Sequence, residues 1–183
     1  MIYIKSPMKK FTLLTMAILL TLVSYSQTTE LSQLWKVKAS FYKAESKSIQ
    51  NLSIFELEGN YKIKRTLEIG LFTGYGKSNW LGYSNIYQNI VNVGINTNFQ
   101  LLPIFIKANN LKPEIYVLFK IGYAYTNTNA STYSDINKSQ MIWGSFLGFA
   151  YYFGRHLGFF IEPGIQKMNE IEFKTHVGIS YRF

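Results

Sequence analysis

The feature that most constrains this chain is a strict alternation of apolar residues with polar or small residues from position 35 onward. In the segment 35–42, Trp, Val, Ala and Phe occupy the odd positions, and Lys, Lys, Ser and Tyr occupy the even positions. Successive side chains of a β-strand point to opposite faces. Each alternating segment is therefore predicted to be a strand with one apolar face and one polar face.

Eight such segments are separated by clusters of turn-forming residues. They cover positions 35–42, 55–63, 67–75, 91–99, 114–124, 143–151, 157–166 and 172–183. Two of them fit less well, because Leu118 interrupts a polar face and the sixth segment is apolar on both faces. With 48% hydrophobic residues but a mean hydropathy near zero, the chain suits strands better than membrane helices. The pattern predicts an all-β fold, an eight-stranded antiparallel up-and-down transmembrane barrel.

The polar face indicates which side of this barrel meets lipid. It carries six acidic and six basic residues that could pair in a narrow, poorly hydrated interior, and it carries most of the strand glycines, which relieve crowding there. The predicted lumen charge network is Lys36, Lys38, Glu56, Glu58, Lys62, Glu68, Glu114, Lys120, Glu162, Glu172, Lys174, His176 and Arg182. Glu56, Glu58 and Glu172 are expected beside Lys36 and Lys38, where they would hold the seam of the barrel closed.

Aromatic residues at the ends of the apolar face, such as Trp35 and Tyr75, favour the two interfacial girdles of a membrane barrel. Two alternatives remain open. One is a soluble periplasmic barrel that binds a lipid or another ligand and turns its apolar face inward. The other is a β-sandwich with an ordinary aromatic core.

The start of the chain has the layout of a cleaved signal peptide over residues 1–26. Lys9 and Lys10 precede an apolar run, 11–23, that is shorter than the roughly 20 residues of a membrane-spanning helix. Ser24 and Ser26 fit the cleavage site, which would leave Gln27 at the mature N-terminus, and Met8 is an alternative start. A short segment, 27–33, would then lead into the barrel, 34–183.

Charge and cysteine content exclude several other classes. Without the three lysines of the predicted signal peptide, the 19 basic residues become 16 against 10 acidic residues, a formal net charge of +6. No nucleic-acid-binding motif accompanies this charge, so no nucleic-acid partner is expected. The chain has no cysteine, which rules out disulfides and thiolate metal sites.

The predicted signal peptide, the eight alternating segments and the ending Val-Gly-Ile-Ser-Tyr-Arg-Phe at 177–183 resemble the small outer-membrane β-barrel family of Gram-negative bacteria, which includes outer-membrane protein A-like and porin-like barrel domains. The resemblance implies an integral protein of the cell outer membrane that contacts outer-membrane lipid. It also implies that Phe173, Tyr181 and Phe183 present the C-terminal strand to the outer-membrane assembly machinery. The connection 102–112 departs from the pattern, because it is long for a periplasmic turn.

The same resemblance places both termini in the periplasm and the loops 77–87 and 126–139 outside the cell. The aromatic and amide side chains of these two loops could bind an extracellular ligand. The expected function is a structural or surface-interaction role, with a narrow channel for small solutes or ions as the alternative.

The two histidines, His156 and His176, are predicted to lie in a turn and in the lumen, too far apart for a shared metal site. Neither a cofactor nor a catalytic residue is expected. A lipid-modifying barrel enzyme would need His176 on the lipid-facing surface, whereas alternation points it inward, as a paired interior histidine.

Overall fold

The computed structural model describes residues 34–46, 49–80, 83–106, 111–128, 138–168 and 170–183. These residues form eight strands and one short helix, α2. In chain order the elements are β1 (Trp35–Ser46), β2 (Ile49–Lys64), β3 (Leu67–Trp80), β4 (Tyr83–Gln100), α2 (Leu102–Phe105), β5 (Pro113–Thr128), β6 (Lys138–Tyr152), β7 (Leu157–Lys167) and β8 (Ile171–Arg182). The predicted all-β fold is confirmed.

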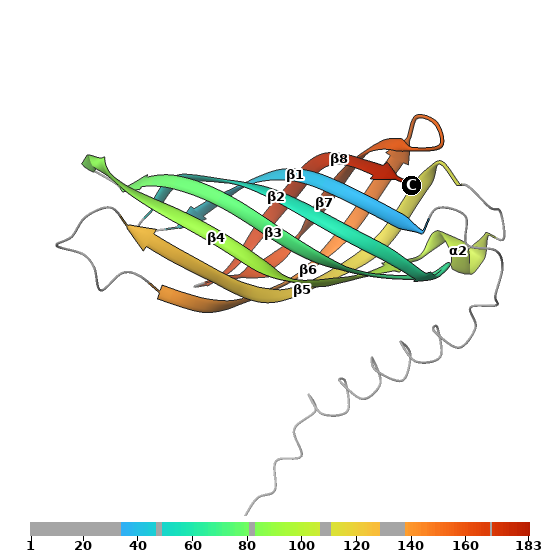
Figure 1. Ribbon diagram of the computed structural model, residues 1–183, viewed down its shortest axis with the longest axis horizontal. Coiled ribbons are helices and arrows are strands. Elements are labelled where there is room, and N and C mark those ends of the chain that lie inside the picture. The colour runs from blue at the N-terminus through green and yellow to red at the C-terminus, as the bar shows by residue number, and fades with distance from the viewer. Residues whose placement is uncertain (1–33, 47–48, 81–82, 107–110, 129–137, 169) are drawn as a thin grey trace, which may run out of the picture.

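The strands close into one barrel in which each pairs antiparallel with the next and β8 pairs with β1. The long, tilted strands wind around a common axis, as Figure 1 shows. At the seam, the N–H of Phe183 donates to the carbonyl oxygen of Trp35 over 2.9 Å. A closed barrel leaves no second sheet for a core to form against, so the β-sandwich alternative is wrong.

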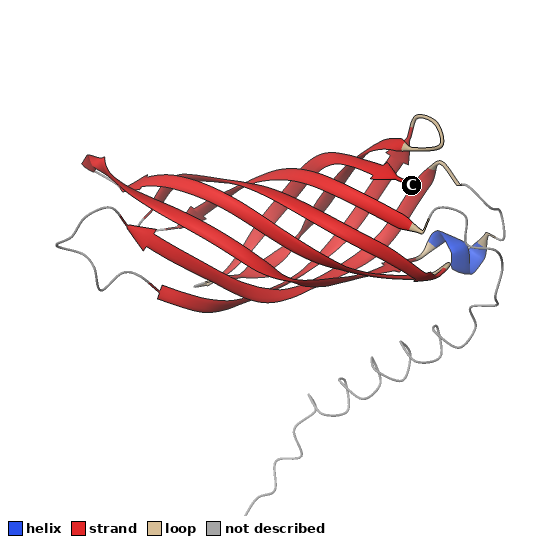
Figure 2. Cartoon of the chain, viewed as in Figure 1, coloured by secondary structure: helices blue, strands red, loops and turns tan. Residues whose placement is uncertain are grey.

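One end of the barrel carries the start of β1 and Phe183 and is called the C-terminal end below. At this end, Arg65 and Thr66 make the tight connection between β2 and β3. The longer connection between β4 and β5 contains α2, in which Pro103 stands in the first turn, where its missing N–H is tolerated (Figure 2). The helix accounts for part of the unusual length of this connection. Among the described residues, no helix is long and apolar enough to cross a membrane.

At the end remote from Phe183, called the far end below, the strands are longer than the alternation predicted. The loop predicted over 77–87 is wrong, because β3 continues to Trp80 and β4 begins at Tyr83, with pairs such as Lys77 opposite Asn89. Likewise β5 runs to Thr128 and β6 begins at Lys138, inside the loop predicted over 126–139. Backbone pairing does not need an apolar face, so it continues where the side chains become polar. Positions 81–82 and 129–137 lie outside the described residues.

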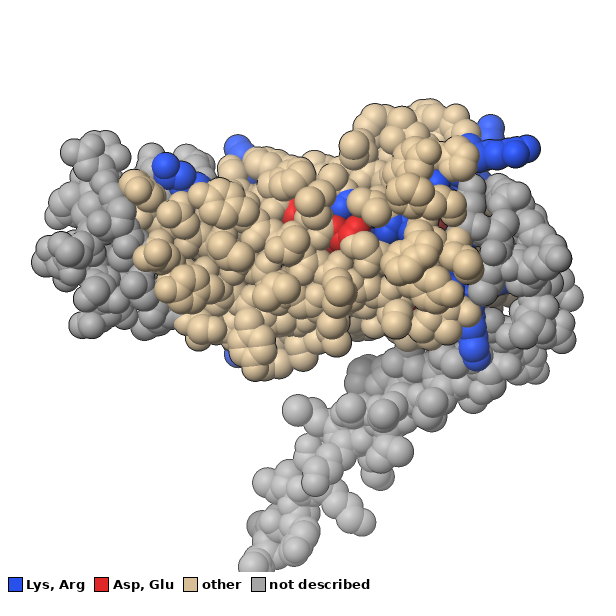
Figure 3. Space-filling model, in the orientation of Figure 1, with Lys and Arg blue, Asp and Glu red and all other residues tan. Residues whose placement is uncertain are grey.

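The odd-numbered residues of the strands point outward and the even-numbered residues point inward. On β3, the side chain of Leu71 is 67% exposed, whereas that of its neighbour Phe72 is 2% exposed. Uncharged residues cover most of the wall drawn in Figure 3, and Lys and Arg gather toward its two ends, apart from a small charged spot near the middle. An outward apolar wall of this size suits hydrocarbon rather than water. The soluble-barrel alternative required the opposite orientation.

Part of the interior is apolar, which the alternation did not predict. Toward the far end, one buried cluster contains Tyr42, Leu52, Ile54, Phe72, Ile90, Ala124 and Ile142, with Met168 packed against it. On the inner side of β5, β6 and β7, a second contains Tyr116, Leu118, Phe146, Ala150, Tyr152 and Phe160. The second cluster explains why Leu118 and the inward residues of the sixth segment are apolar. Leu118, Phe146 and Ala150 pack with one another inside the barrel.

Two of the inward glycines make room for large side chains, as expected of a narrow barrel. A Cβ added at Gly148 would overlap the ring of Tyr116, and one at Gly178 would lie 2.8 Å from the ring of Phe160. Gly148 is paired with Tyr116 and Gly178 with Phe160, so each ring lies over the glycine of the neighbouring strand. The rings fill the lumen without widening it.

Candidate functional site: the charged lumen

The middle of the lumen holds a cluster of three carboxylates and two lysines on four strands. Lys120, from β5, contacts the carboxylates of Glu56 and Glu58, both on β2. Lys38, from β1, lies 2.9 Å from Glu58 and also contacts Glu162, from β7. All five side chains are buried. These residues are called the central cluster below.

A second group of charges lies nearer the C-terminal end. Nζ of Lys36 lies 2.9 Å from the carboxylate of Glu68 and 2.8 Å from that of Glu114, which Arg182 also contacts at 2.7 Å. This group ties β1 to β3 and β5 across the lumen. It also ties β8 to β5, so the ion pairs link strands that are not neighbours in the wall.

Amide and hydroxyl groups also donate hydrogen bonds to these carboxylates. Asn96 donates to Glu58 over 2.9 Å, Gln100 donates to Glu68 over 3.2 Å, and the hydroxyl of Tyr116 donates to Glu162 over 2.6 Å. Hydrogen bonds of this kind offset the cost of removing a carboxylate from water. Sequence reasoning missed these partners, although Asn96 and Gln100 occupy inward positions of β4.

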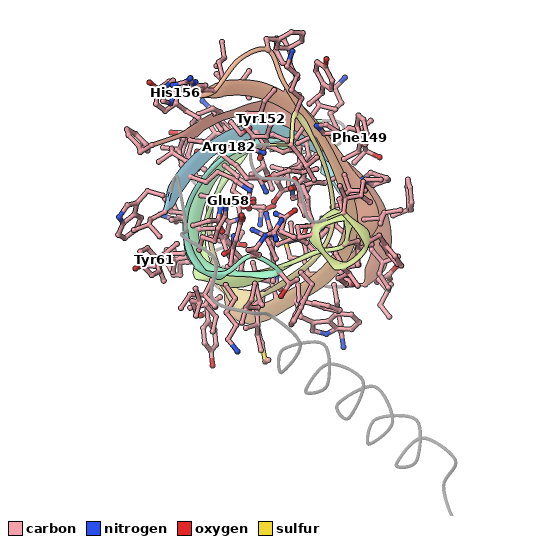
Figure 4. The ribbon with its side chains drawn as sticks, turned by 90° about the vertical axis from the view of Figure 1, so that its right-hand side faces the viewer. Glu58, Tyr61, Phe149, Tyr152, His156 and Arg182 are labelled. Atoms are coloured by element: carbon pink, nitrogen blue, oxygen red, sulfur yellow. The ribbon has the colours of Figure 1, made fainter. Side chains whose placement is uncertain are left out.

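Aromatic rings also contact the cations of the lumen. The guanidinium of Arg182 lies 3.3 Å from the ring centroid of Tyr152, and Nζ of Lys38 lies 4.7 Å from that of Phe160. Such cation–π contacts stabilise a charge that has lost its hydration. Viewed along the axis, Glu58, Tyr152 and Arg182 point into the barrel, while Tyr61, Phe149 and His156 lie outside it (Figure 4).

Two of the predicted pairings are wrong. Glu172 does not approach Lys36 or Lys38, because antiparallel pairing brings the end of β8 to the start of β1, so that Lys36 faces Arg182. Glu172 begins β8 and lies instead 3.4 Å from Lys174, with its side chain 26% exposed. Glu56 also lies away from Lys36 and Lys38 and contacts Lys120. The predicted contact of Glu58 with Lys38 is confirmed.

Lys62 is half-buried near the C-terminal end. Both it and Glu172 stand where the lumen opens toward solvent, at opposite ends. Ten of the twelve predicted acidic and basic residues are buried, and these are Lys36, Lys38, Glu56, Glu58, Glu68, Glu114, Lys120, Glu162, Lys174 and Arg182.

The two histidines occupy the different environments that the sequence predicted. His156 lies at the β6–β7 connection, 2.7 Å from the carbonyl oxygen of Arg182. His176 is fully buried in the lumen and points away from lipid. As predicted, it lies beside charged partners, with Nδ1 3.8 Å from a carboxylate oxygen of Glu56 and of Glu162. Neither ring nitrogen has a hydrogen-bond partner among the described residues.

The other predicted site residues fall at the two ends of the chain. Phe173, Tyr181 and Phe183 point outward from β8 and the C-terminus and are exposed. Ser24, Ser26 and Gln27 lie outside the described residues. The signal peptide and its cleavage site therefore stay predictions.

Ion pairs and apolar side chains together fill the lumen. Each carboxylate of the central cluster contacts at least one of the two lysines, and the apolar cluster around Ile54 and Ile90 fills the lumen toward the far end. The site is a cross-linked interior that holds the eight strands together.

No family model matches the sequence, and no curated protein does. Solved structures match at the level of the fold. Neisserial surface protein A is 10% identical, with a TM-score of 0.55 over 81% of this chain and 94% of that chain. Ail, the attachment invasion locus protein of Yersinia pestis, is 12% identical, with a TM-score of 0.51 over 82% of this chain and 97% of that chain.

The N-terminal β-barrel domain of Pseudomonas aeruginosa OprF is 11% identical, with a TM-score of 0.52 over 83% of this chain and 98% of that chain. At this level of identity, the comparison concerns the fold alone. It agrees with the closed barrel formed by the eight strands. The chain therefore has the fold of the small eight-stranded outer-membrane β-barrels.

Proposed function

We propose that this chain is an integral outer-membrane protein with a structural or surface-interaction role and a lumen that does not conduct. The observation that carries the proposal is the combination of an apolar wall with an interior closed by buried ion pairs. An eight-stranded barrel is just wide enough for side chains to fill. In this one they are held by charge pairs across the lumen.

The alternative of a narrow channel would require these pairs to separate. Lys120 would have to leave both Glu56 and Glu58, and the apolar cluster near the far end would have to open as well. Separating one partner of a buried pair costs about 3–5 kcal/mol. A conducting state would therefore be rare, which favours the structural role.

Planar-bilayer recording tests this proposal. We expect purified, refolded protein to give no unitary conductance steps. Faster gel migration of the unboiled sample than of the boiled one would confirm that the protein applied to the bilayer is a folded barrel. Regular steps from such protein would instead support the channel alternative.

We also propose that the C-terminal strand is read by the outer-membrane assembly machinery and that the far end of the barrel faces the cell exterior. Phe173, Tyr181 and Phe183 support the first point, since they form an exposed apolar row on β8 and the C-terminus. A lipid-modifying role finds less support, because His176 lies inside the lumen.

The far end offers a surface on which an extracellular ligand could bind. On the outward face of β3 and β4, Nζ of Lys77 lies 4.2 Å from the ring centroid of Tyr87, and the hydroxyl of Tyr75 donates to Asn89 over 3.0 Å. The structure of Ail has been determined in complex with the heparin analogue sucrose octasulfate. We propose an anionic saccharide as the class of ligand for this surface.

Replacing Lys77 by glutamine is expected to weaken binding of sucrose octasulfate about fivefold, because one charge contact worth about 1 kcal/mol is lost. Isothermal titration at low salt measures the change. Lys112→Gln, an exposed lysine near the C-terminal end, is the matched control. Equal losses in the two variants would mean that binding follows net charge and not this surface.

A further inference from the structure

His176 stands where three buried carboxylates of the central cluster meet. Its Nδ1 atom lies 3.8 Å from Glu56 and 3.8 Å from Glu162. Its side chain is completely buried, and neither ring nitrogen has a hydrogen-bond partner among the described residues. One carboxylate oxygen of Glu162 lacks a partner as well. Buried polar groups without partners are costly, so this group of atoms needs an explanation.

Packing holds the imidazole in place. The ring lies parallel to that of Tyr42, with centroids 4.1 Å apart and an interplanar angle of 6°, and a tilted Phe146 ring lies 4.6 Å away. Rings on two sides leave the imidazole little freedom to turn. Its Nδ1 atom is therefore held near the carboxylates without bonding to them.

The formal charges of the central cluster leave room for a cation. Glu56, Glu58 and Glu162 carry three negative charges, and Lys38 and Lys120 carry two positive charges. Lys174, the third lysine near His176, pairs with Glu172 instead. With a neutral imidazole, the cluster has a formal charge of −1, and all of its side chains are buried.

We propose that His176, Glu56 and Glu58 form a binding site for a divalent transition-metal ion. One ligand atom from each lies within 4.8 Å of the other two. Imidazole nitrogen and carboxylate oxygen are the ligands that zinc accepts in proteins, at about 2.1 Å. Two such ligands on a tetrahedral ion lie roughly 3.4 Å apart, so the 3.8 Å between His176 and Glu56 has to close by a few tenths of an ångström, and the widest separation in the set, which is at most 4.8 Å, by no more than about 1.4 Å.

Lys120 competes with the metal for the same oxygen atoms, because it contacts both Glu56 and Glu58. Binding therefore requires its ammonium group to move aside, which the flexible four-carbon stem of a lysine permits. This site does not depend on the surface role proposed above.

The test uses zinc as the probe and magnesium as the comparison, because magnesium prefers oxygen ligands alone. The full chain is refolded from urea into detergent with each metal, so that the closed lumen does not block entry. Free metal is then removed. We expect about one zinc ion per chain by elemental analysis, no retained magnesium, and a higher temperature at which the fast-migrating gel band disappears.

His176→Gln should lower zinc affinity by at least about 100-fold, since even the outer partners of metal ligands contribute 10–100-fold. His156→Gln, which removes the other histidine of the chain, is the matched control and should retain zinc. Glu56→Gln provides a second, nearly isosteric test of the ligand set, and gel migration reports whether each variant folds. Absence of zinc from the wild-type barrel would overturn the proposal, as would retention of zinc by both ligand variants.

Discussion

Replacing Lys120 by methionine is expected to lower the free energy of unfolding by about 3–5 kcal/mol, the usual cost of removing one partner from a buried ion pair. Lys120 contacts both Glu56 and Glu58, so its loss leaves adjacent buried carboxylates without their shared cation. Methionine keeps most of the side-chain volume between the rings of Phe72 and Phe146, which lie within 6 Å of the lysine nitrogen. The loss should therefore be largely electrostatic. Urea titration in detergent, followed by tryptophan fluorescence, measures it.

The matched control is Lys43→Met, because Lys43 lies on the outer face of the same barrel and is exposed. Its replacement should change stability by less than about 0.5 kcal/mol. Adding Glu56→Gln to the Lys120 variant should restore part of the loss, since one of the unpaired charges is then removed. Equal effects at Lys120 and Lys43, or no recovery in the double variant, would show that the central cluster does not stabilise the fold.

The alternation in the sequence was sufficient to predict the fold and the direction of most side chains. At Leu71 and Phe72, for example, neighbouring residues of similar hydrophobicity point to opposite sides, because the side-chain period of a strand is two. The strand count followed from the same pattern. The number of strands and the direction of their side chains both follow from the two-residue period of a strand, which is visible in the sequence itself.

The pairing of charges could not be predicted in the same way. Alternation places Lys36 in the lumen, but its partner Glu114 is 78 residues away and lies on β5, across the barrel. Which side chains meet there depends on the stagger of all the strands between them. The predicted contact of Lys36 with Glu172 is wrong, although β1 and β8 are neighbours, because their register brings Arg182 and not Glu172 opposite Lys36.

The apolar cluster near the far end has a signal in the sequence. Ile54, Ile90 and Ile142 continue the inward period beyond or at the edge of the predicted segments. The predicted loops 77–87 and 126–139 overlap the starts of β4 and β6, the strands that carry Ile90 and Ile142. Extending the period through polar segments would have indicated both the longer strands and the apolar cluster.

A positive charge at the middle of the apolar wall should be nearly as damaging as the loss of Lys120. Leu71 is 67% exposed and stands opposite Gly59 on β2 and Ile95 on β4, midway along the outward apolar row of β3. Leu71→Arg is expected to lower the free energy of unfolding by about 2–4 kcal/mol in lipid vesicles, the cost of arginine at the bilayer midplane. Urea titration of the vesicle-embedded protein measures this loss.

The matched control is Asn127→Arg, because Asn127 points outward near the far end of β5, beyond the apolar row. Arginine near an interface costs only about 0–1 kcal/mol, since its guanidinium reaches water and lipid headgroups. The difference between the two variants therefore measures depth in the membrane and not the size of the new side chain. A similar loss at both positions would place Leu71 outside the hydrocarbon and contradict the membrane-spanning arrangement, whereas a loss confined to Leu71 would show that the outward apolar face contacts lipid.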